Sequence, residues 1–420
     1  MAMSRNLDGW LEYISSQHPS TIALGLDRVD DVWRRMDMTW TPVTLTVGGT
    51  NGKGSSCAFA ERILLESGYK VGMYTSPHIL RYNERVRVQG EDADDETLVR
   101  SFEAVEAARG DTPLTYFEYG TLAAFAVFAE AKLDAVILEV GLGGRLDAVN
   151  VIDADVAIVA SVDLDHQAFL GNDRESIGFE KAGIFRANRP AIFGDTNPPA
   201  RLVEHAKAIG ANLQVLGEDF RYEAQERQWD FIGRHGAKRA LPMPALRGRW
   251  QLKNASSVLA ALDELTDRVP VSLGEIKRGL TNVRLAGRLQ VLPGRPVIVL
   301  DVGHNPHAAR ALADALGDMG FFENTRAVFA MLADKDIGGV IDALRHRIDA
   351  WYVAAVDAER AAPAATVAKM LADRGLEKAT RTFATVPLAL ENARREAGPN
   401  DRILVFGSFY TVAEALRSVR

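Results

Sequence analysis

The chain of 420 residues is long enough for two or three domains with sizeable hydrophobic cores. Apolar residues make up 47% of the chain and charged residues 25%, a composition too apolar for a disordered protein. Asp and Glu number 56 against 49 Lys and Arg, which gives a formal charge of −7. Phosphate-backbone binders usually need a basic surface, so we expect no nucleic-acid partner.

The sequence predicts neither a secretory signal nor a membrane span. Residues 1–10 include Arg5 and Asp8 and have no apolar core. The longest apolar helix-like stretch, residues 122–129, is too short to cross a bilayer. The single cysteine, Cys57, excludes an internal disulfide, and its small and apolar neighbours favour a packed core thiol over a catalytic one. We therefore expect a cytoplasmic protein.

A phosphate-binding loop is predicted at residues 47–56, which read Val-Gly-Gly-Thr-Asn-Gly-Lys-Gly-Ser-Ser. An apolar, β-branched run at 43–47 leads into it, and a helix-like stretch at 56–67 follows. Glycines let backbone amides converge on an anion, and a helix N-terminus adds positive potential. Lys53 is placed to reach the β and γ phosphates and Ser55 to bind magnesium. A glycine-rich turn without a ligand would not explain a lysine between two glycines.

Continuous apolar runs separated by helical stretches predict an α/β protein with a P-loop-type, mostly parallel sheet and flanking helices. The first series of predicted strands lies at residues 43–47, 70–74, 135–140, 156–161 and 191–193. A second series at 297–300, 327–331, 351–355 and 403–406 predicts a smaller, Rossmann-like α/β domain. Glycines and prolines within 285–296 predict a hinge without regular structure, and the charged segment 220–245 predicts a small hairpin. We expect domains at residues 1–290 and 291–420.

Polar side chains follow three of these predicted strands. Ser76 comes after the run at 70–74, Glu139 lies near the end of 135–140, and His166 follows 156–161. In parallel sheets these ends share one edge, where ligands gather. A carboxylate in an apolar run is costly to bury unless it is paired or holds a cation. His166 alone would be an ordinary histidine, but three strand ends together predict a magnesium site beside Ser55.

Gly54 separates Lys53 from Ser55, which departs from the common P-loop spacing. Further motifs follow at 75–78, 114–121, 139–147, 165–166, 180–184 and 301–307. The loop is similar to that of the Mur-ligase superfamily, and the motifs in this order resemble its dihydrofolate synthase/folylpolyglutamate synthase family. The resemblance implies that ATP phosphorylates the carboxylate of dihydropteroate or of a folate glutamate. The amine of L-glutamate then attacks the acyl phosphate.

The resemblance also implies roles for individual residues. The implied catalytic residues are Lys53, His166 and Lys181. The implied ATP contacts are Thr50, Asn51, Gly52, Lys53, Gly54, Ser55, Asn254, Arg288, Asp301 and His304. The implied pterin contacts are Ala23, Leu24, Gly25, Leu26, Thr115, Tyr116, Phe117, Glu118, Leu146, Asp147 and Ala148. The implied metal ligands are Ser55, Ser76, Glu139, His166 and Lys181.

Two of the positions also have simpler interpretations. Lys181 matches a lysine that the family carries N-carboxylated, but by residue type alone it could equally be a phosphate-facing or surface charge. The segment after the predicted strand 297–300 offers Asn305 as a helix N-cap and Pro306 as the first helical residue. That cap signal does not explain Asp301 and His304 at the end of the strand.

Two other functions compete with a folate ligase. A Mur-type peptidoglycan ligase would share the loop, but the segments 24–27 and 115–118 look like folate-side motifs. A P-loop switch would hydrolyse nucleotide without an acid or an amine, and it typically lacks a second catalytic domain. The expected partners are therefore dihydropteroate, folates and L-glutamate, with Mg²⁺ and ATP and no membrane, and the resemblance favours a monomer. A monovalent, potassium-type cation has no support among the residues.

Overall fold

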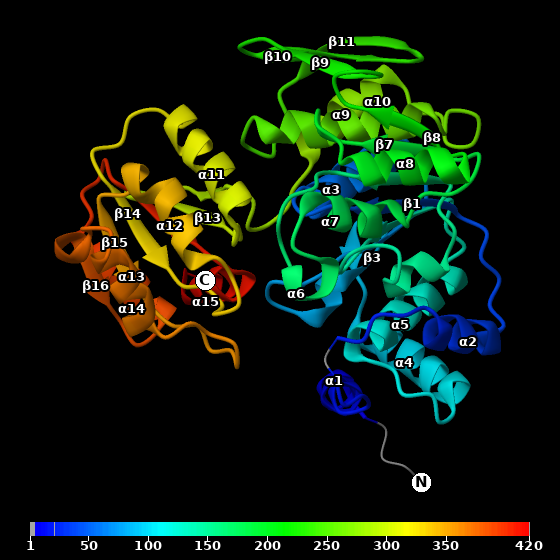
Figure 1. Cartoon of the computed structure of the whole chain (residues 1–420), viewed down its shortest axis with the longest axis horizontal. Helices are drawn as coiled ribbons and strands as arrows, with labels where there is room; N and C mark the ends of the chain where they lie inside the picture. Colours follow the sequence, from blue (N-terminus) through cyan, green and yellow to red (C-terminus); the bar gives the residue numbers. More distant parts are fainter. Residues whose placement is uncertain (1–4, 21, 420) are drawn as a thin grey trace. The chain divides into compact units, whose positions relative to one another are not determined.

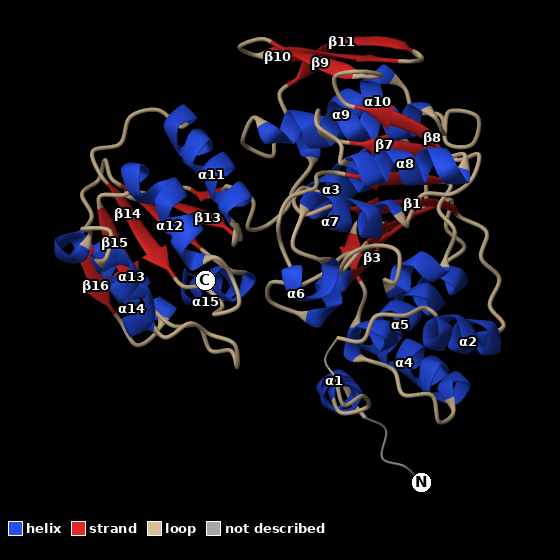
Figure 2. Ribbon diagram, in the orientation of Figure 1, coloured by secondary structure: helices blue, strands red, loops and turns tan. Residues whose placement is uncertain are grey.

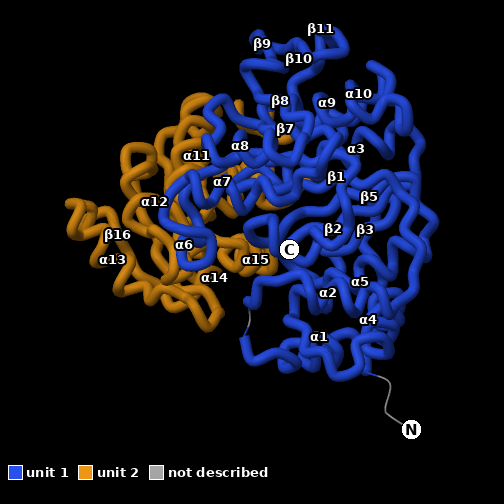
Figure 3. The backbone as a smooth tube through the Cα atoms, turned by 45° about the vertical axis from the view of Figure 1, so that its right-hand side comes forward, with its two compact units in different colours: residues 1–245, 252–283 blue, residues 246–251, 284–420 orange. Residues whose placement is uncertain are grey.

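The computed structural model describes residues 5–20 and 22–419. The chain forms two compact units (Figure 3): unit 1 comprises Met1–Ala245 and Leu252–Val283, and unit 2 comprises Leu246–Gln251 and Arg284–Arg420. Each unit contains a mostly parallel sheet with flanking helices, coloured along the chain in Figure 1 and by element type in Figure 2. The predicted fold class is confirmed.

The main sheet of unit 1 has eight strands in the order β4-β3-β2-β5-β1-β6-β7-β8. Neighbours from β2 to β8 are parallel, whereas β3 and β4 add an antiparallel edge. The strands are β1 Val43–Gly48, β2 Val71–Tyr74, β3 Val86–Val88, β4 Glu91–Asp92, β5 Ala135–Glu139, β6 Val156–Val159, β7 Pro190–Phe193 and β8 Asn212–Val215. The predicted runs became β1, β2, β5, β6 and β7. The edge strands β3, β4 and β8 were missed because they are short and partly polar.

Helices cover both faces of this sheet (Figure 2). The helix α3 packs against β1, β2 and β5 on one face, while α5 packs on β2 and on α4. The helical segments of unit 1 are α1 Leu7–Ser15, α2 Asp27–Met36, α3 Lys53–Glu66, η1 Tyr82–Arg85, α4 Asp95–Arg109, α5 Tyr116–Glu130, η2 Ala148–Val151, α6 Gln167–Leu170, α7 Arg174–Ala182, α8 Ala200–Ile209 and α10 Leu273–Asn282. The helix α9 Trp250–Asp263 begins with two residues of unit 2 and continues in unit 1. In the part of the chain that the structure describes, no helix has both the length and the hydropathy of a membrane span.

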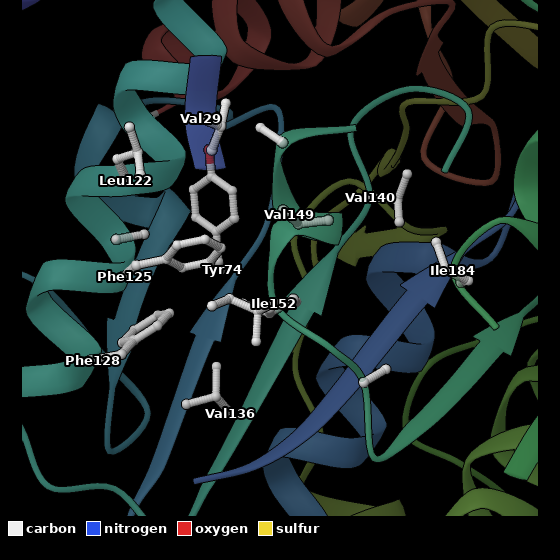
Figure 4. Close-up of a cluster of buried hydrophobic side chains, with 14 of the residues drawn as sticks. Val29, Tyr74, Leu122, Phe125, Phe128, Val136, Val140, Val149, Ile152 and Ile184 are labelled. Carbon is white, nitrogen blue, oxygen red and sulfur yellow. The ribbon is translucent and has the colours of Figure 1, made fainter. Parts of the chain in front are cut away.

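Apolar side chains between α5 and the sheet form the core shown in Figure 4. Phe125 and Phe128 of α5 lie with Tyr74 of β2 and Val136 of β5, all of them fully buried or nearly so. Burial of large aromatic side chains supplies much of the free energy that holds helix and sheet together. Cys57 is also completely buried, which confirms a packed thiol.

A small antiparallel sheet, β11-β10-β9, is inserted before α9. Its strands are β9 Arg221–Ala224, β10 Gln228–Gly233 and β11 Gly236–Pro242. The predicted hairpin is thus present as β10 and β11, with β9 added. Trp229 and Phe231 anchor it because both side chains are fully buried.

The sheet of unit 2 has six strands in the order β12-β13-β17-β14-β15-β16, parallel except for β12. The strands are β12 Gln290–Leu292, β13 Val297–Asp301, β14 Thr325–Phe329, β15 Ala350–Val353, β16 Thr380–Thr382 and β17 Arg402–Phe406. Its helical segments are α11 Pro306–Asp318, α12 Ile337–Leu344, η3 Arg345–Arg347, α13 Ala364–Ala372, η4 Glu377–Ala379, α14 Val386–Glu396 and α15 Phe409–Val419.

Two predictions for unit 2 have opposite outcomes. The helix start was right, because the Asn305 side chain accepts a hydrogen bond from the amide of Ala308 and Pro306 opens α11. The prediction that 285–296 lacks regular structure was wrong, because β12 pairs with β13 inside that segment. Gly287 and Pro293 lie on either side of β12, so they bound the strand and do not break it.

Candidate nucleotide and metal site

The phosphate-binding loop joins β1 to α3. Every residue of β1 is buried, and α3 begins at Lys53 with Gly52 as its N-cap in the left-handed region. The Lys53 amine donates hydrogen bonds to the carbonyl oxygens of Gly49 (3.0 Å) and Thr50 (3.3 Å). Ser55 lies in the first turn of α3, where only 2% of it is exposed. The structure therefore forms the strand, loop and helix that a phosphate cradle needs.

Glycine is required at two points of this loop. Gly49 has φ +142°, and a Cβ there would lie 3.1 Å from the amide nitrogen of Ala160. Gly52 has φ +90°, and a Cβ there would lie 2.5 Å from Oδ1 of Asn254. Asn254 comes from α9 and is buried against the loop, far from it in sequence. The structure thus brings the predicted ATP contacts Gly52 and Asn254 together.

The first residues of the loop are tied to the segment that follows β6. The amides of Thr50 and Asn51 donate to the carbonyl oxygen and to Oγ of Ser161, at 2.8 and 3.1 Å. The Thr50 hydroxyl donates to the Asp163 carbonyl and accepts from the Asp163 amide, both at 3.0 Å. Our sequence interpretation missed Ser161, although it closes the predicted strand 156–161.

The ends of β2, β5 and β6 meet around β1, as expected from the sequence. Glu139 pairs in register with Val47 of β1 and is only 4% exposed. Its Oε2 accepts a hydrogen bond of 3.0 Å from the amide of Ser76, which follows β2. His166 lies beyond β6 on the other side of β1, half-exposed at the start of α6, with φ +51°. The sheet edge therefore presents a buried carboxylate, a serine and an imidazole near the loop.

Lys181, in α7, is 4% exposed, so the interpretation as a surface charge is wrong. Burial, and then the positive charge of Lys53, lower the pKa of Lys181 from 10.5 to about 7. The carboxylates of Asp165 and Asp147 act in the opposite direction. A substantial fraction of the amine is therefore neutral at pH 7, and a neutral amine is a nucleophile.

The predicted magnesium ligands form a mixed donor set. Within residues 5–20 and 22–419, no three His, Cys, Asp or Glu side chains gather as a self-sufficient metal site. The candidates add two serines and a lysine to Glu139 and His166. Magnesium commonly takes one or two carboxylates together with substrate phosphates and water, so a buried carboxylate beside a phosphate loop fits it.

The predicted pterin segments converge in unit 1. The amide of Gly25 donates to the carbonyl of Leu146 at 3.3 Å. The Phe117 ring lies against the backbone of Gly141, where an added Cβ would come within 2.6 Å of the ring. Thr115 and Glu118 form a capping box at the start of α5. The remaining predicted pterin residues, Ala23, Leu24, Leu26, Tyr116 and Ala148, lie in the same segments.

An ion pair that we did not predict ties two of these segments together. Arg28 donates to Glu118 at 2.7 Å and to the carbonyl of Ala23 at 2.9 Å. In the third segment Asp147 is buried, and its carboxylate accepts from the amides of Leu142 (2.7 Å) and Val149 (3.1 Å). Burial raises the pKa of Asp147 from 3.8 to about 6, although these hydrogen bonds act to lower it.

In unit 2, the end of β13 carries a second polar cluster. Asp301 is buried and accepts hydrogen bonds from the amides of Leu289 (2.8 Å) and Gly303 (2.7 Å), and burial raises its pKa. The guanidinium of Arg288 lies 5.1 Å from the ring centroid of Phe409, and the ring of His304 lies 6.4 Å from it. The predicted contacts Arg288, Asp301 and His304 therefore surround one strand end, and Phe409 was missed.

Comparison with known families matches both parts of the chain. Residues 47–262 match the Mur ligase middle domain, and residues 287–409 match the Mur ligase glutamate ligase domain. The loop, the sheet edge and these two matches define the chain as a Mur ligase.

Individual relatives show to which family of Mur ligases the chain belongs. Dihydrofolate synthase/folylpolyglutamate synthase of Escherichia coli is 44% identical over 98% of this chain and 95% of its own length. The enzyme of the same name from Bacillus subtilis is 32% identical over 89% of this chain and 90% of its own length. The structure of E. coli FolC in complex with DHPP and ADP has a TM-score of 0.94 at 43% identity and covers 99% of this chain and 98% of its own. The chain belongs to the dihydrofolate synthase/folylpolyglutamate synthase family.

Proposed function

We propose that the loop at residues 49–55 binds ATP, which activates a pteroate or folate carboxylate for attack by L-glutamate. The chain is an ATP-dependent ligase of the dihydrofolate synthase/folylpolyglutamate synthase type. One observation carries the residue assignment: the Lys53 loop, the Ser76 and Glu139 edge and the pterin segments all lie in unit 1. The peptidoglycan ligase and the nucleotide switch are set aside by identity over nearly the full length of folate enzymes.

The reaction has two steps, and neither step needs an oxidant or a reductant. A carboxylate oxygen attacks the γ-phosphorus, and the bond between the γ-phosphorus and the oxygen of the β-phosphate breaks. ADP departs, and the phosphoryl group stays on the carboxylate as an acyl phosphate. The glutamate amine then attacks the acyl carbon, loses a proton and expels phosphate. Lys53, with the α3 N-terminus, offsets the negative charge on the transferred phosphoryl group.

The metal assignment follows from the donor set. Ser55, Ser76, Glu139 and His166 would hold Mg²⁺, with Lys181 contributing once it is carboxylated. Bound Mg²⁺ would supply charge neutralisation of the phosphates. A structure of a bifunctional relative with Mn, AMPPNP and L-glutamate bound, 42% identical with a TM-score of 0.92, supports the assignment. Incubation with ¹³C-bicarbonate tests the modification, because a carbamate signal should appear in the wild type and be missing in Lys181→Gln.

The pterin would lie among the three converging segments, with Phe117 as the stacking surface and Asp147 at its polar edge. Arg288, Asp301 and His304 would contact the nucleotide.

We also propose catalytic domains at residues 1–290 and 291–420, a monomer, a cytoplasmic location and no nucleic-acid partner. Light scattering after gel filtration tests the monomer, because a mass of two chains would contradict it.

The decisive experiment measures phosphate release with ATP and Mg²⁺. The ligase requires both dihydropteroate and L-glutamate, so omission of either one should abolish turnover. Replacing dihydropteroate by tetrahydrofolate tests the second activity of the family separately. Phosphate release that continues without acid and amine would contradict the assignment.

A further inference from the structure

The hydroxyls of Thr50 and Ser161 connect the phosphate-binding loop to the segment that follows β6, two parts of the site that lie far apart in the sequence. Each forms a closed ring with the backbone amide and carbonyl of one residue in the opposite segment. The Ser161 hydroxyl accepts from the amide of Asn51 (3.1 Å) and donates to its carbonyl (3.0 Å). The Thr50 hydroxyl does the same with Asp163, at 3.0 Å in both directions. We refer to these two rings, together with the bond from the Thr50 amide to the Ser161 carbonyl, as the clasp.

The clasp uses backbone amides that a phosphate loop would otherwise direct at an anion. The amides of both Thr50 and Asn51 donate to Ser161. Phosphate binding therefore falls to the amides at the start of α3 and to Lys53. The Thr50 hydroxyl is also engaged, because it donates to the carbonyl of Asp163 and accepts from the amide of Asp163.

The segment held by the clasp leads directly to His166. Beyond the clasp, the Asp163 carboxylate accepts from the amide of Leu164 (2.8 Å), and the Asp165 carboxylate accepts from the amide of His166 (2.9 Å). The guanidinium of Arg174 holds the carbonyl of Val162 at 3.1 Å. The clasp and Arg174 therefore anchor residues 161–163, and the bonds of Asp163 and Asp165 shape the local turns from there to His166.

Packing also keeps the two segments at one separation. A Cβ on Gly49 would lie 3.2 Å from the amide nitrogen of Ser161 and 3.2 Å from the Cβ of Ala160. The amide of Ala160 donates to the carbonyl of Gly48 at 2.9 Å, which extends the β1–β6 ladder up to the clasp. The clasp therefore continues a rigid strand pair.

We propose that Thr50 and Ser161 are positioning residues that fix the His166 segment relative to the phosphate-binding loop, and so set where the metal lies against the nucleotide. The inference rests on the proposed roles of Lys53 and His166. The resemblance counts Thr50 among the ATP contacts, but in the structure its hydroxyl bonds to Asp163 and its amide to Ser161. The effect of the two hydroxyls passes through the imidazole, as partners of metal ligands commonly act.

The test separates nucleotide binding from metal binding. Thr50→Val and Ser161→Ala each remove one hydroxyl. ADP affinity without divalent cation, measured by calorimetry, should stay within about twofold, because the α3 amides and Lys53 are kept. The affinity of the ADP complex for Mn²⁺, measured from the EPR signal of free Mn²⁺, should fall by about tenfold or more, and kcat with it. Thr50→Ser, which keeps the hydroxyl, should recover most of both.

Thr44→Val is the matched control. Thr44 is buried at the opposite end of β1, where its hydroxyl accepts from the Trp40 indole (2.9 Å) and donates to the Pro42 carbonyl (3.2 Å). The Thr44→Val substitution removes a comparable hydroxyl from the same strand and should leave the affinity for Mn²⁺ unchanged.

Three outcomes would overturn the proposal: equal losses of ADP and Mn²⁺ affinity, unchanged Mn²⁺ affinity in both variants, or Thr50→Ser behaving like Thr50→Val. A wild type that binds no Mn²⁺ with ADP would instead contradict the metal assignment of the proposed function.

Discussion

Lys53 is the one cation that the loop itself places at the start of α3, where its amine lies over two loop carbonyls. We predict that Lys53→Ala lowers kcat for glutamate ligation by about 10²-fold or more, because a pre-organised charge that stabilises the transferred phosphoryl group is lost. Steady-state phosphate release measures the change. Lys207→Ala, on the exposed side of α8, is the control and should retain wild-type turnover. Near-normal activity of Lys53→Ala would place the γ-phosphate elsewhere.

Asp147 makes stability depend on pH in a defined direction. Its pKa is about 6 in the folded protein against a usual 3.8. Between these two pH values the carboxyl group is therefore protonated in the folded state and ionised in the unfolded state. The contribution of Asp147 to the free energy of unfolding is therefore full below pH 4 and falls as pH rises through 6, by about 3 kcal/mol.

The comparison with Asp147→Asn isolates this effect, because asparagine does not titrate. Between pH 4.5 and pH 6.5, the urea midpoint of the wild type should fall relative to that of the variant. Above pH 7, the difference between the two midpoints should no longer change with pH. A difference that does not change with pH would show that Asp147 titrates normally.

At the scale of elements, the approach of α9 to the phosphate loop depends on the absence of a side chain at Gly52. Gly52→Ala would strain the backbone by about 1–3 kcal/mol and push against Asn254 Oδ1, 2.5 Å from the new methyl. We predict at least a tenfold loss of ADP affinity by calorimetry. The control is Gly68→Ala, which has a similar φ of +84° just beyond the other end of α3 but no atom within 4 Å of the new methyl. Equal ADP affinities in the two variants would refute the contact.

Arg28 connects α2 to α5 and holds the carbonyl of Ala23, so its loss should loosen the predicted pterin segment at residues 23–26. Arg28→Met leaves the Glu118 carboxylate, 4% exposed, without its cation. Because Arg28 is itself partly exposed, we expect a loss of about 1–2 kcal/mol in unfolding free energy, and a KM for dihydropteroate raised roughly tenfold with kcat little changed. Arg34→Met removes an exposed i,i+4 pair from the same helix and should change neither. A fall in kcat alone would argue against a binding role.

The sequence predicted the elements that carry the strongest local signals. The apolar runs of β1, β5 and β17 and the caps of α11 were recognisable because each depends on adjacent residues. It missed contacts between distant segments, such as Arg28 with Glu118 and Thr50 with Asp163, because no local pattern encodes a partner about a hundred residues away. Lys181 shows the same limit, since only the fold reveals that its side chain is buried.

At the scale of the molecule, unit 2 has a hydrophobic core of its own. Phe329, Trp351 and Phe406 are fully buried in it, and Phe329 stacks on Phe406 with ring centroids 4.6 Å apart. The six-stranded sheet of unit 2 is built from residues 290–406 alone. Trp250, at the start of α9, packs against this core from outside that range.

We therefore predict that the fragment 284–420 folds by itself, with a cooperative urea transition and an α/β circular dichroism spectrum. Trp250, which is partly buried against this core, lies outside the fragment, so Trp250→Ala in the full-length chain should lower the free energy of unfolding of unit 2 by about 1 kcal/mol or more. The fragment should release no phosphate from ATP, because the loop that carries Lys53 is absent. A fragment 284–420 without a cooperative transition would show that unit 2 depends on the rest of the chain for its fold.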